Sequence, residues 1–209
     1  MLLFGHVGIT LGAAGVIAGL AGNSSRGETS AATKNPRADS TIAGKRTARL
    51  AAWFSKLGDY LDIRFLLIGS ILPDIIDKPV GQYLFRETLS NGRVFCHTLI
   101  FLLLITVSGW YLYRRYHRTW LLALASGTAA HLVLDRMWEA PKTLLWPFFG
   151  LTFERVDLTY WTSGLLRALL TDPGTYIPEL VGIAVFAWFI WLLWRCRGIY
   201  AFLRHGYVC

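Results

Sequence analysis

The chain has 209 residues, of which 54% are hydrophobic and only 16% are charged, and it carries a formal net charge of +8. A disordered chain needs low hydrophobicity and high charge, so this class is excluded. An ordinary soluble domain, with about a quarter of its residues charged, is disfavoured. A basic excess in such an apolar chain is typical of cytoplasmic membrane-protein loops rather than of nucleic-acid binding. We therefore expect a membrane protein that has membrane lipids, and no nucleic acid, as partners.

The apolar segments predict an all-α membrane protein, a bundle of about five transmembrane helices in one integral membrane domain over residues 1–209. The expected spans cover roughly residues 1–22, 64–77, 94–113, 119–138 and 177–194. The second falls short of the roughly 17 residues that a spanning helix needs, and Pro73 predicts that it is interrupted. The first contains glycine pairs whose spacing favours close helix packing, Gly8/Gly12 and Gly15/Gly19.

Basic residues indicate the orientation of these spans. With the amino terminus outside, the cytoplasmic segments hold 13 Lys and Arg residues and the outer segments hold 7. The positive-inside rule then favours a multi-pass protein of the cell (plasma or inner) membrane, with its carboxyl terminus in the cytoplasm. The cytoplasmic loop 23–62 divides into a flexible part, 23–44, and an amphipathic interfacial helix, 45–62. The spacing of the three cysteines predicts no disulfide framework.

Six ionisable residues lie within or beside the apolar segments, and all of them fall near the outer ends of the expected spans. A charged side chain at mid-bilayer costs about 2.5–3.5 kcal/mol on insertion scales, so such residues usually face the bundle interior and mark a site. His131 and Asp135 are four residues apart and project from one helix face. The six residues are His6, Asp74, Asp77, His97, His131 and Asp135.

Imidazole nitrogen together with carboxylate oxygen favours a divalent transition metal, with zinc as the first choice and manganese or iron as alternatives. The predicted metal ligands are His6, Asp74, His97, His131 and Asp135. Asp77 or Glu139 is expected to take a proton from a metal-activated water or to orient it. Arg93 and Arg136 are expected to bind a substrate phosphate. The alternative is structural: interhelical hydrogen bonds for the histidines, a cap or ion pair for the aspartates, and snorkelling for the arginines.

Four sequence motifs resemble the membrane-bound metal-dependent hydrolase family, which has a distant similarity to zinc-dependent phospholipase C. They are GSILPDIIDK at 69–78, GRVFCHTL at 92–99, HLVLD at 131–135 and LWPF at 145–148, and the early His6 also fits. The resemblance implies phosphoester chemistry on a small-molecule or lipid substrate. The family often has histidines where this chain has Lys78 and Gly92, so a multinuclear centre is not expected to be complete.

The sequence therefore predicts a membrane-bound metal-dependent hydrolase that cleaves a phosphoester or lipid headgroup near the outer membrane face. Two other classes remain open. One is a non-catalytic metal or haem binder, although aspartates are poor axial ligands for haem. The other is a proton- or ion-coupled transporter, which the short second span would suit. The sequence does not predict the oligomeric state.

Overall fold

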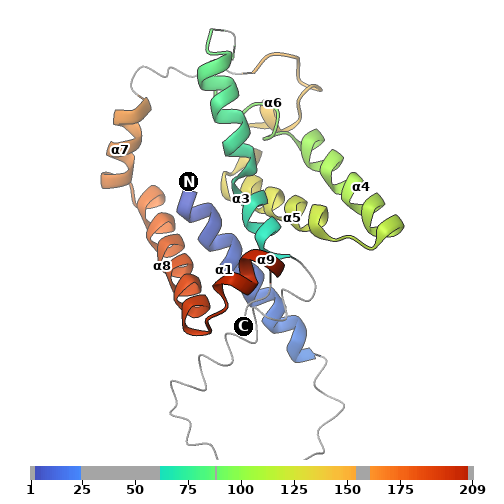
Figure 1. Cartoon of the computed structure of the whole chain (residues 1–209). Coiled ribbons are helices and arrows are strands. Elements are labelled where there is room, and N and C mark those ends of the chain that lie inside the picture. Colours follow the sequence, from blue (N-terminus) through green and yellow to red (C-terminus); the bar gives the residue numbers. More distant parts are fainter. Residues whose placement is uncertain (1–2, 25–61, 88, 154–160, 207–209) are drawn as a thin grey trace, which may run out of the picture.

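The computed structural model describes residues 3–24, 62–87, 89–153 and 161–206, and within these ranges the chain is helical and contains no strand (Figure 1). The expected flexible segment 23–44 and amphipathic helix 45–62 lie almost wholly outside the described residues. Two short turns, the π-helix η1 (Val80–Leu84) and the 3-10 helix η2 (Met137–Glu139), follow the ends of longer helices. The described α-helices are α1 (Leu3–Ser24), α3 (Ile63–Pro79), α4 (Leu99–Tyr116), α5 (Trp120–Leu134), α6 (Pro141–Leu144), α7 (Trp161–Thr171), α8 (Pro173–Arg195) and α9 (Ile199–His205).

The long helices form a bundle in which α1 packs against both α8 and α3, and α5 packs against both α3 and α4 (Figure 1). A buried apolar cluster joins the end of α8 to α1, α3 and α9 through residues such as Leu11, Leu66, Phe189 and Phe202. The ionisable residues of the predicted spans lie at the opposite ends of α1, α3 and α5. The bundle thus has an apolar end and a polar end.

Helix α3 continues through Pro73, so the predicted interruption of this helix was wrong. Proline has no N–H to offer the carbonyl four residues earlier, which here belongs to Gly69. The hydroxyl Oγ1 of Thr128 on α5 lies 3.3 Å from that carbonyl oxygen and 3.1 Å from the Leu124 carbonyl oxygen. Neighbouring Thr side chains often pair the carbonyls that proline leaves open in membrane helices. Because α3 stays helical, Asp74 and Asp77 lie on consecutive turns of one helix.

Helices α1 and α8 approach each other closely at a pair of glycines. A Cβ atom added to Gly8 would lie 2.1 Å from the carbonyl oxygen of Gly182, and none fits there. This contact confirms the close packing predicted from the glycine spacing of the first span at Gly8. At the start of the same pair of helices, the buried carboxylate of Glu179 accepts a hydrogen bond from the Gly5 N–H over 3.1 Å. Helix α8 therefore fixes the position of the first turn of α1.

Among the described residues, α8 is the one helix that is both long and apolar enough to cross a membrane. Shorter apolar helices cover Leu3–Ile17 and Trp120–Leu134. Helix α4 exposes large apolar side chains such as Leu104, Val107 and Trp110 along its length. An exposed apolar surface of this kind is unusual in a soluble monomer and suits contact with lipid.

Cys196, at the C-cap of α8, is disulfide-bonded, which the cysteine spacing did not predict.

Candidate metal centre

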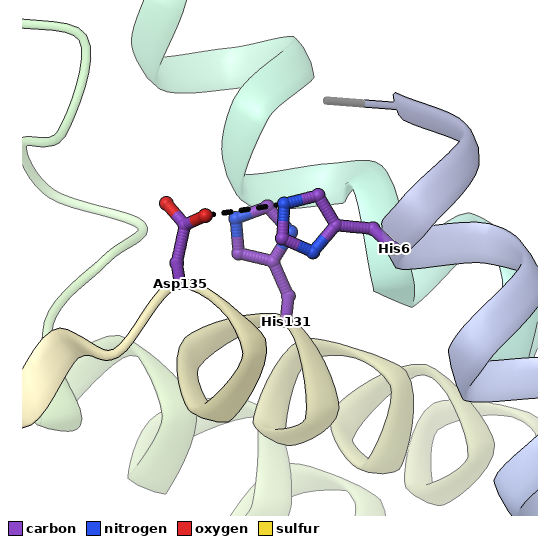
Figure 2. Close-up of side chains that lie close together, drawn as sticks. All are labelled: His6, His131 and Asp135. Atoms are coloured by element: carbon purple, nitrogen blue, oxygen red, sulfur yellow. Dashed lines mark ion pairs between the residues drawn. The ribbon is translucent and has the colours of Figure 1, made fainter. Parts of the chain in front are cut away.

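The polar end of the bundle gathers side chains from four separate segments of the chain. His6 comes from the first turns of α1, Asp74 from α3, and His131 from the last turn of α5. Asp135 is the residue directly after α5, and His97 precedes the N-cap of α4. Two triads, His6–His131–Asp135 and Asp74–His97–His131, each offer ligand atoms that lie within 4.8 Å of one another. Figure 2 shows the first triad, with the imidazole rings of His6 and His131 stacked beside the carboxylate of Asp135.

The rings of His97 and His131 present their Nε2 atoms to each other over 3.2 Å. Nδ1 of His131 lies 2.8 Å from the carbonyl oxygen of Ser70, and a carbonyl only accepts, so this nitrogen carries the proton. Nδ1 of His97 lies 2.7 Å from Oδ2 of Asp77 and donates in the same way. In the neutral rings both Nε2 atoms then carry lone pairs that face each other. Such an arrangement repels unless a shared proton or a metal ion lies between the two nitrogens.

His6 is fully buried, yet neither of its ring nitrogens makes a hydrogen bond to any described residue. Its Nε2 lies 3.2 Å from Oδ1 of Asp135 without hydrogen-bond geometry (Figure 2). A buried polar group without a partner is costly, and nearly all such groups in native structures are paired with protein, water or an ion. A ring nitrogen of His6 can therefore offer its lone pair to a bound ion.

The carboxylates of Asp74 and Asp135 each face two ways. Oδ1 of Asp74 lies 3.7 Å from Nε2 of His97, while its Oδ2 lies 2.6 Å from Nζ of Lys78. Oδ1 of Asp135 faces His6, and its Oδ2 lies 2.9 Å from Nη2 of Arg93. Each carboxylate thus has one oxygen on a basic side chain and the other toward an imidazole, and Oδ2 of Asp135 also lies 3.9 Å from Nε2 of His97.

Asp77 lies behind His97 and is fully buried. Besides Nδ1 of His97, its carboxylate accepts hydrogen bonds from the backbone N–H groups of Val94, Cys96 and His97 at 2.8–3.2 Å. These bonds hold the segment before α4 in a non-helical conformation. The helix consequently begins at Leu99, later than the start of the expected span at residue 94.

The remaining predicted site residues, Glu139 and Arg136, lie outside the cluster. Their side chains are 62% and 69% exposed, and Oε1 of Glu139 lies 3.6 Å from Nη1 of Arg136. Both line a groove of about 720 Å³ that reaches Asp135 and Arg93 and continues past the start of α8. Asp172 lines the same groove and caps α8. Hydrogen bonds from the Thr175 hydroxyl and the Gly174 N–H hold the pKa of Asp172 below its ordinary value.

The donor set fits a divalent transition metal. Zinc bonds imidazole nitrogen at about 2.0–2.1 Å, which places neighbouring ligand atoms of a tetrahedral site roughly 3.3 Å apart. The 3.2 Å between the Nε2 atoms of His97 and His131 and the 3.2 Å between His6 Nε2 and Asp135 Oδ1 are close to this spacing. The hydrogen bonds from Nδ1 to Asp77 and to the Ser70 carbonyl are the outer contacts that metal-ligating histidines usually make.

Sequence reasoning missed three contacts of the site. The pairing of Lys78 with Asp74 follows a four-residue helical spacing and was within its reach. The contacts of Arg93 with Asp135 and of Glu179 with Gly5 join residues that are distant in the chain and carry no local signal.

A comparison with protein-family models matches residues 1–205 to the family described as YdjM inner membrane protein. Comparison with curated proteins and with solved structures found no match. The assignment to the membrane-bound metal-dependent hydrolase family, and with it the link to zinc-dependent phospholipase C, was therefore wrong. The four motifs are short, and short motifs match by chance more often than a model of the whole chain. Because the family model spans nearly the whole chain, this protein belongs to the YdjM inner membrane protein family.

Proposed function

We propose that this membrane protein binds a divalent transition metal, zinc in the first place, and uses it to hydrolyse a phosphoester or a lipid headgroup. The facing Nε2 atoms of His97 and His131, 3.2 Å apart, support this proposal most directly. Their opposite nitrogens are both committed as donors, so the two lone pairs need a proton or a metal ion between them, and the carboxylate and imidazole donors close by favour the metal ion. His6, Asp74 and Asp135 would complete the ligand set.

A bound divalent ion would act as a Lewis acid and lower the pKa of a coordinated water toward neutrality. The residues of the chain have distinct tasks in this proposal. Asp77 orients His97 and is too committed to backbone N–H groups to transfer protons. Glu139 faces the groove that leads to Asp135 and is exposed enough to exchange protons with solvent, so it is the candidate general base.

The proposed topology has five spans, with the amino terminus outside and the carboxyl terminus in the cytoplasm. In this arrangement α1 and α4 run inward while α3 and α5 run outward. His6 and His97 near the start of the inward helices, and Asp74, His131 and Asp135 near the end of the outward helices, then share one level close to the outer face. A lipid headgroup at the outer surface would be within reach of that level.

Metal analysis of the detergent-purified full chain tests the proposal. Wild type is expected to retain about one zinc equivalent after dialysis against chelator-free buffer, and His131→Ala is expected to lose it. His117→Asn is the matched control, because His117 is exposed at the C-cap of α4, where its positive φ suits asparagine. Equal and negligible metal in wild type and His131→Ala would reject the metal centre.

Turnover is tested on a panel of soluble phosphoesters and of phospholipids in vesicles, with and without chelator. The hydrolase proposal predicts cleavage that chelator abolishes and that zinc restores. Bound metal without any chelator-sensitive cleavage would leave a non-catalytic metal-binding protein in place of the enzyme.

A further inference from the structure

We infer that Lys78 and Arg93 form a phosphate-binding site at the mouth of the metal centre, so that metal and phosphate bind cooperatively. This inference rests on the proposed metal centre and deepens it. It names the residues that recognise the substrate and the anion that balances the charge of the metal. It also separates Lys78 and Arg93 from Arg136, which the sequence placed in the same role.

The geometry places both cations on the outer oxygens of the two ligand carboxylates. Nζ of Lys78 lies 2.6 Å from Oδ2 of Asp74, and Nη2 of Arg93 lies 2.9 Å from Oδ2 of Asp135. Their inner oxygens face the imidazoles. A ligand that displaces these outer contacts, or bridges across them, therefore arrives directly beside the metal ligands.

Both cations are also open to the outside. The Lys78 side chain is 35% exposed and the Arg93 side chain 44% exposed, whereas the histidines behind them are fully buried. The stem of Lys78 lies beside Gly92, the residue directly before Arg93, since a Cβ added to Gly92 would come within 3.4 Å of Cγ of Lys78 and 2.6 Å of Nε2 of Gln82. The missing side chain at residue 92 leaves room for the stem of Lys78 and the end of Gln82 next to the backbone that carries Arg93.

Charge balance shows why an anion is needed. Three carboxylates, those of Asp74, Asp77 and Asp135, and two cations leave the cluster with one net negative charge when the imidazoles are neutral. A divalent ion would turn this into one net positive charge in a largely buried site, where uncompensated charge is costly. Lys78 and Arg93 thus weaken metal binding, and an anion that binds to them offsets this effect.

Phosphate suits this pair of cations. A guanidinium binds two phosphate oxygens side by side, and an ammonium adds a point charge. Arg136 lacks the connection to the cluster, because its side chain is 69% exposed and forms an ion pair with Glu139 at 3.6 Å. It is therefore the matched control for Arg93: an arginine at the same end of the bundle and in the same groove.

The experiment measures zinc affinity of the full chain in detergent with chelator-buffered zinc, with and without methylphosphonate, a phosphate mimic that cannot be hydrolysed. Sodium chloride keeps the ionic strength equal. Coupling of two ligands is typically 5–150-fold and reciprocal, so methylphosphonate is expected to tighten zinc binding about tenfold in wild type. Arg93→Gln and Lys78→Gln are each expected to reduce this gain to below about threefold, while Arg136→Gln keeps it.

A second readout separates this role from a merely structural one. Without methylphosphonate, Arg93→Gln and Lys78→Gln are expected to bind zinc at least as tightly as wild type, because a competing cation has been removed. A structural defect would weaken zinc binding in both conditions. Arg93→Lys keeps the charge but loses the two-oxygen contact of the guanidinium, so it is expected to retain only part of the coupling, which provides a test if Arg93→Gln does not fold.

Three results would overturn the inference: no effect of methylphosphonate on a wild type that binds zinc, equal coupling in Arg93→Gln and Arg136→Gln, or weaker zinc binding of Arg93→Gln and Lys78→Gln without the anion. Wild type that binds no zinc at all would reject the proposed function instead. Nanodiscs of phosphatidic acid against phosphatidylcholine, without methylphosphonate, distinguish the source of the phosphate. Tighter zinc binding in phosphatidic acid assigns the site to a lipid headgroup, and tightening by methylphosphonate alone assigns it to a soluble phosphate ester.

Discussion

Asp77 accepts a hydrogen bond from Nδ1 of His97 over 2.7 Å, and this contact decides which nitrogen of His97 faces the cluster. The same carboxylate holds the backbone of the segment before α4 through the N–H groups of Val94 and Cys96. One buried side chain therefore both shapes the loop and orients the ring that the loop carries. The cluster depends on Asp77 although Asp77 does not face its centre.

Replacing Asp77 by Asn is expected to weaken zinc binding about 10–100-fold, the usual effect of removing the outer partner of a ligating histidine. The amide of Asn offers the backbone N–H groups one acceptor oxygen in place of two. The negative charge of the carboxylate, which supports the His97 ring, is lost. Titration with chelator-buffered zinc measures the change. Asp62→Asn is the matched control, since Asp62 caps the opposite end of α3 and bonds Arg64. Equal zinc affinities in the two variants would contradict this role of Asp77.

Gly8→Ala is expected to destabilise the protein by about 1–3 kcal/mol, because the new methyl group would force α1 away from Gly182. Gly164→Ala, in α7, has nothing within 4 Å of the added atom and is expected to be neutral or stabilising by roughly 0.5–1 kcal/mol. Thermal unfolding in detergent, followed by circular dichroism without added metal, compares the two. If both alanines shift the midpoint alike, the close approach of α1 and α8 is not as described.

Thr128→Val is expected to cost about 1 kcal/mol, since it leaves the Gly69 carbonyl opposite Pro73 without its hydroxyl partner. In a Pro73→Ala background the restored N–H at residue 73 bonds that carbonyl, so the same change is expected to cost less. A double-mutant cycle with both substitutions measures the difference, which is expected to be about 0.5 kcal/mol or more. An identical cost in both backgrounds would show that Thr128 does not support the helix at Pro73.

The segment 114–118, which covers the last turn of α4 and the start of the link to α5, is expected to face the cytoplasm because of its three arginines, Arg114, Arg115 and Arg118. The disulfide bond of Cys196 favours instead a placement of the end of α8 outside the cytoplasm, because disulfides persist in oxidising compartments. A single cysteine placed in this segment, in a background lacking the native cysteines, distinguishes the two. Protection from an impermeant thiol reagent in intact cells supports the cytoplasmic placement. Labelling would show that the proposed orientation is wrong and that the candidate metal centre opens on the cytoplasmic side.

The sequence predicted the polar end of the bundle better than its helices. Residues such as His6, His97 and His131 stand out because ionisable side chains are rare in apolar segments, and their positions near alternate helix ends are enough to predict that they meet. This signal is global, because it depends on the direction of each span. It does not depend on the exact helix limits, which explains why the displaced start of α4 did not disturb it.

Features decided by tertiary contacts were beyond sequence reasoning. The local rule for proline predicted a break at Pro73, whereas a hydroxyl from another helix lies within hydrogen-bond distance of the carbonyl that proline leaves open. The role of Asp77 depends on N–H groups of a segment some twenty residues later, which no spacing rule describes. The family was also predicted wrongly, since unrelated membrane proteins can share short motifs at helix ends.

The hydrogen bond from the Gly5 N–H to Glu179 joins residues 174 positions apart, at the two extremes of the chain. His6 follows Gly5 directly, so α8 helps to set the position of its ring by holding the first turn of α1. During translation, the first of the proposed metal ligands to leave the ribosome is thus the last to be held in position. A nascent or prematurely terminated chain would carry the other imidazoles and carboxylates without a finished cluster, so binding of the proposed metal would be a late event in the insertion of the protein.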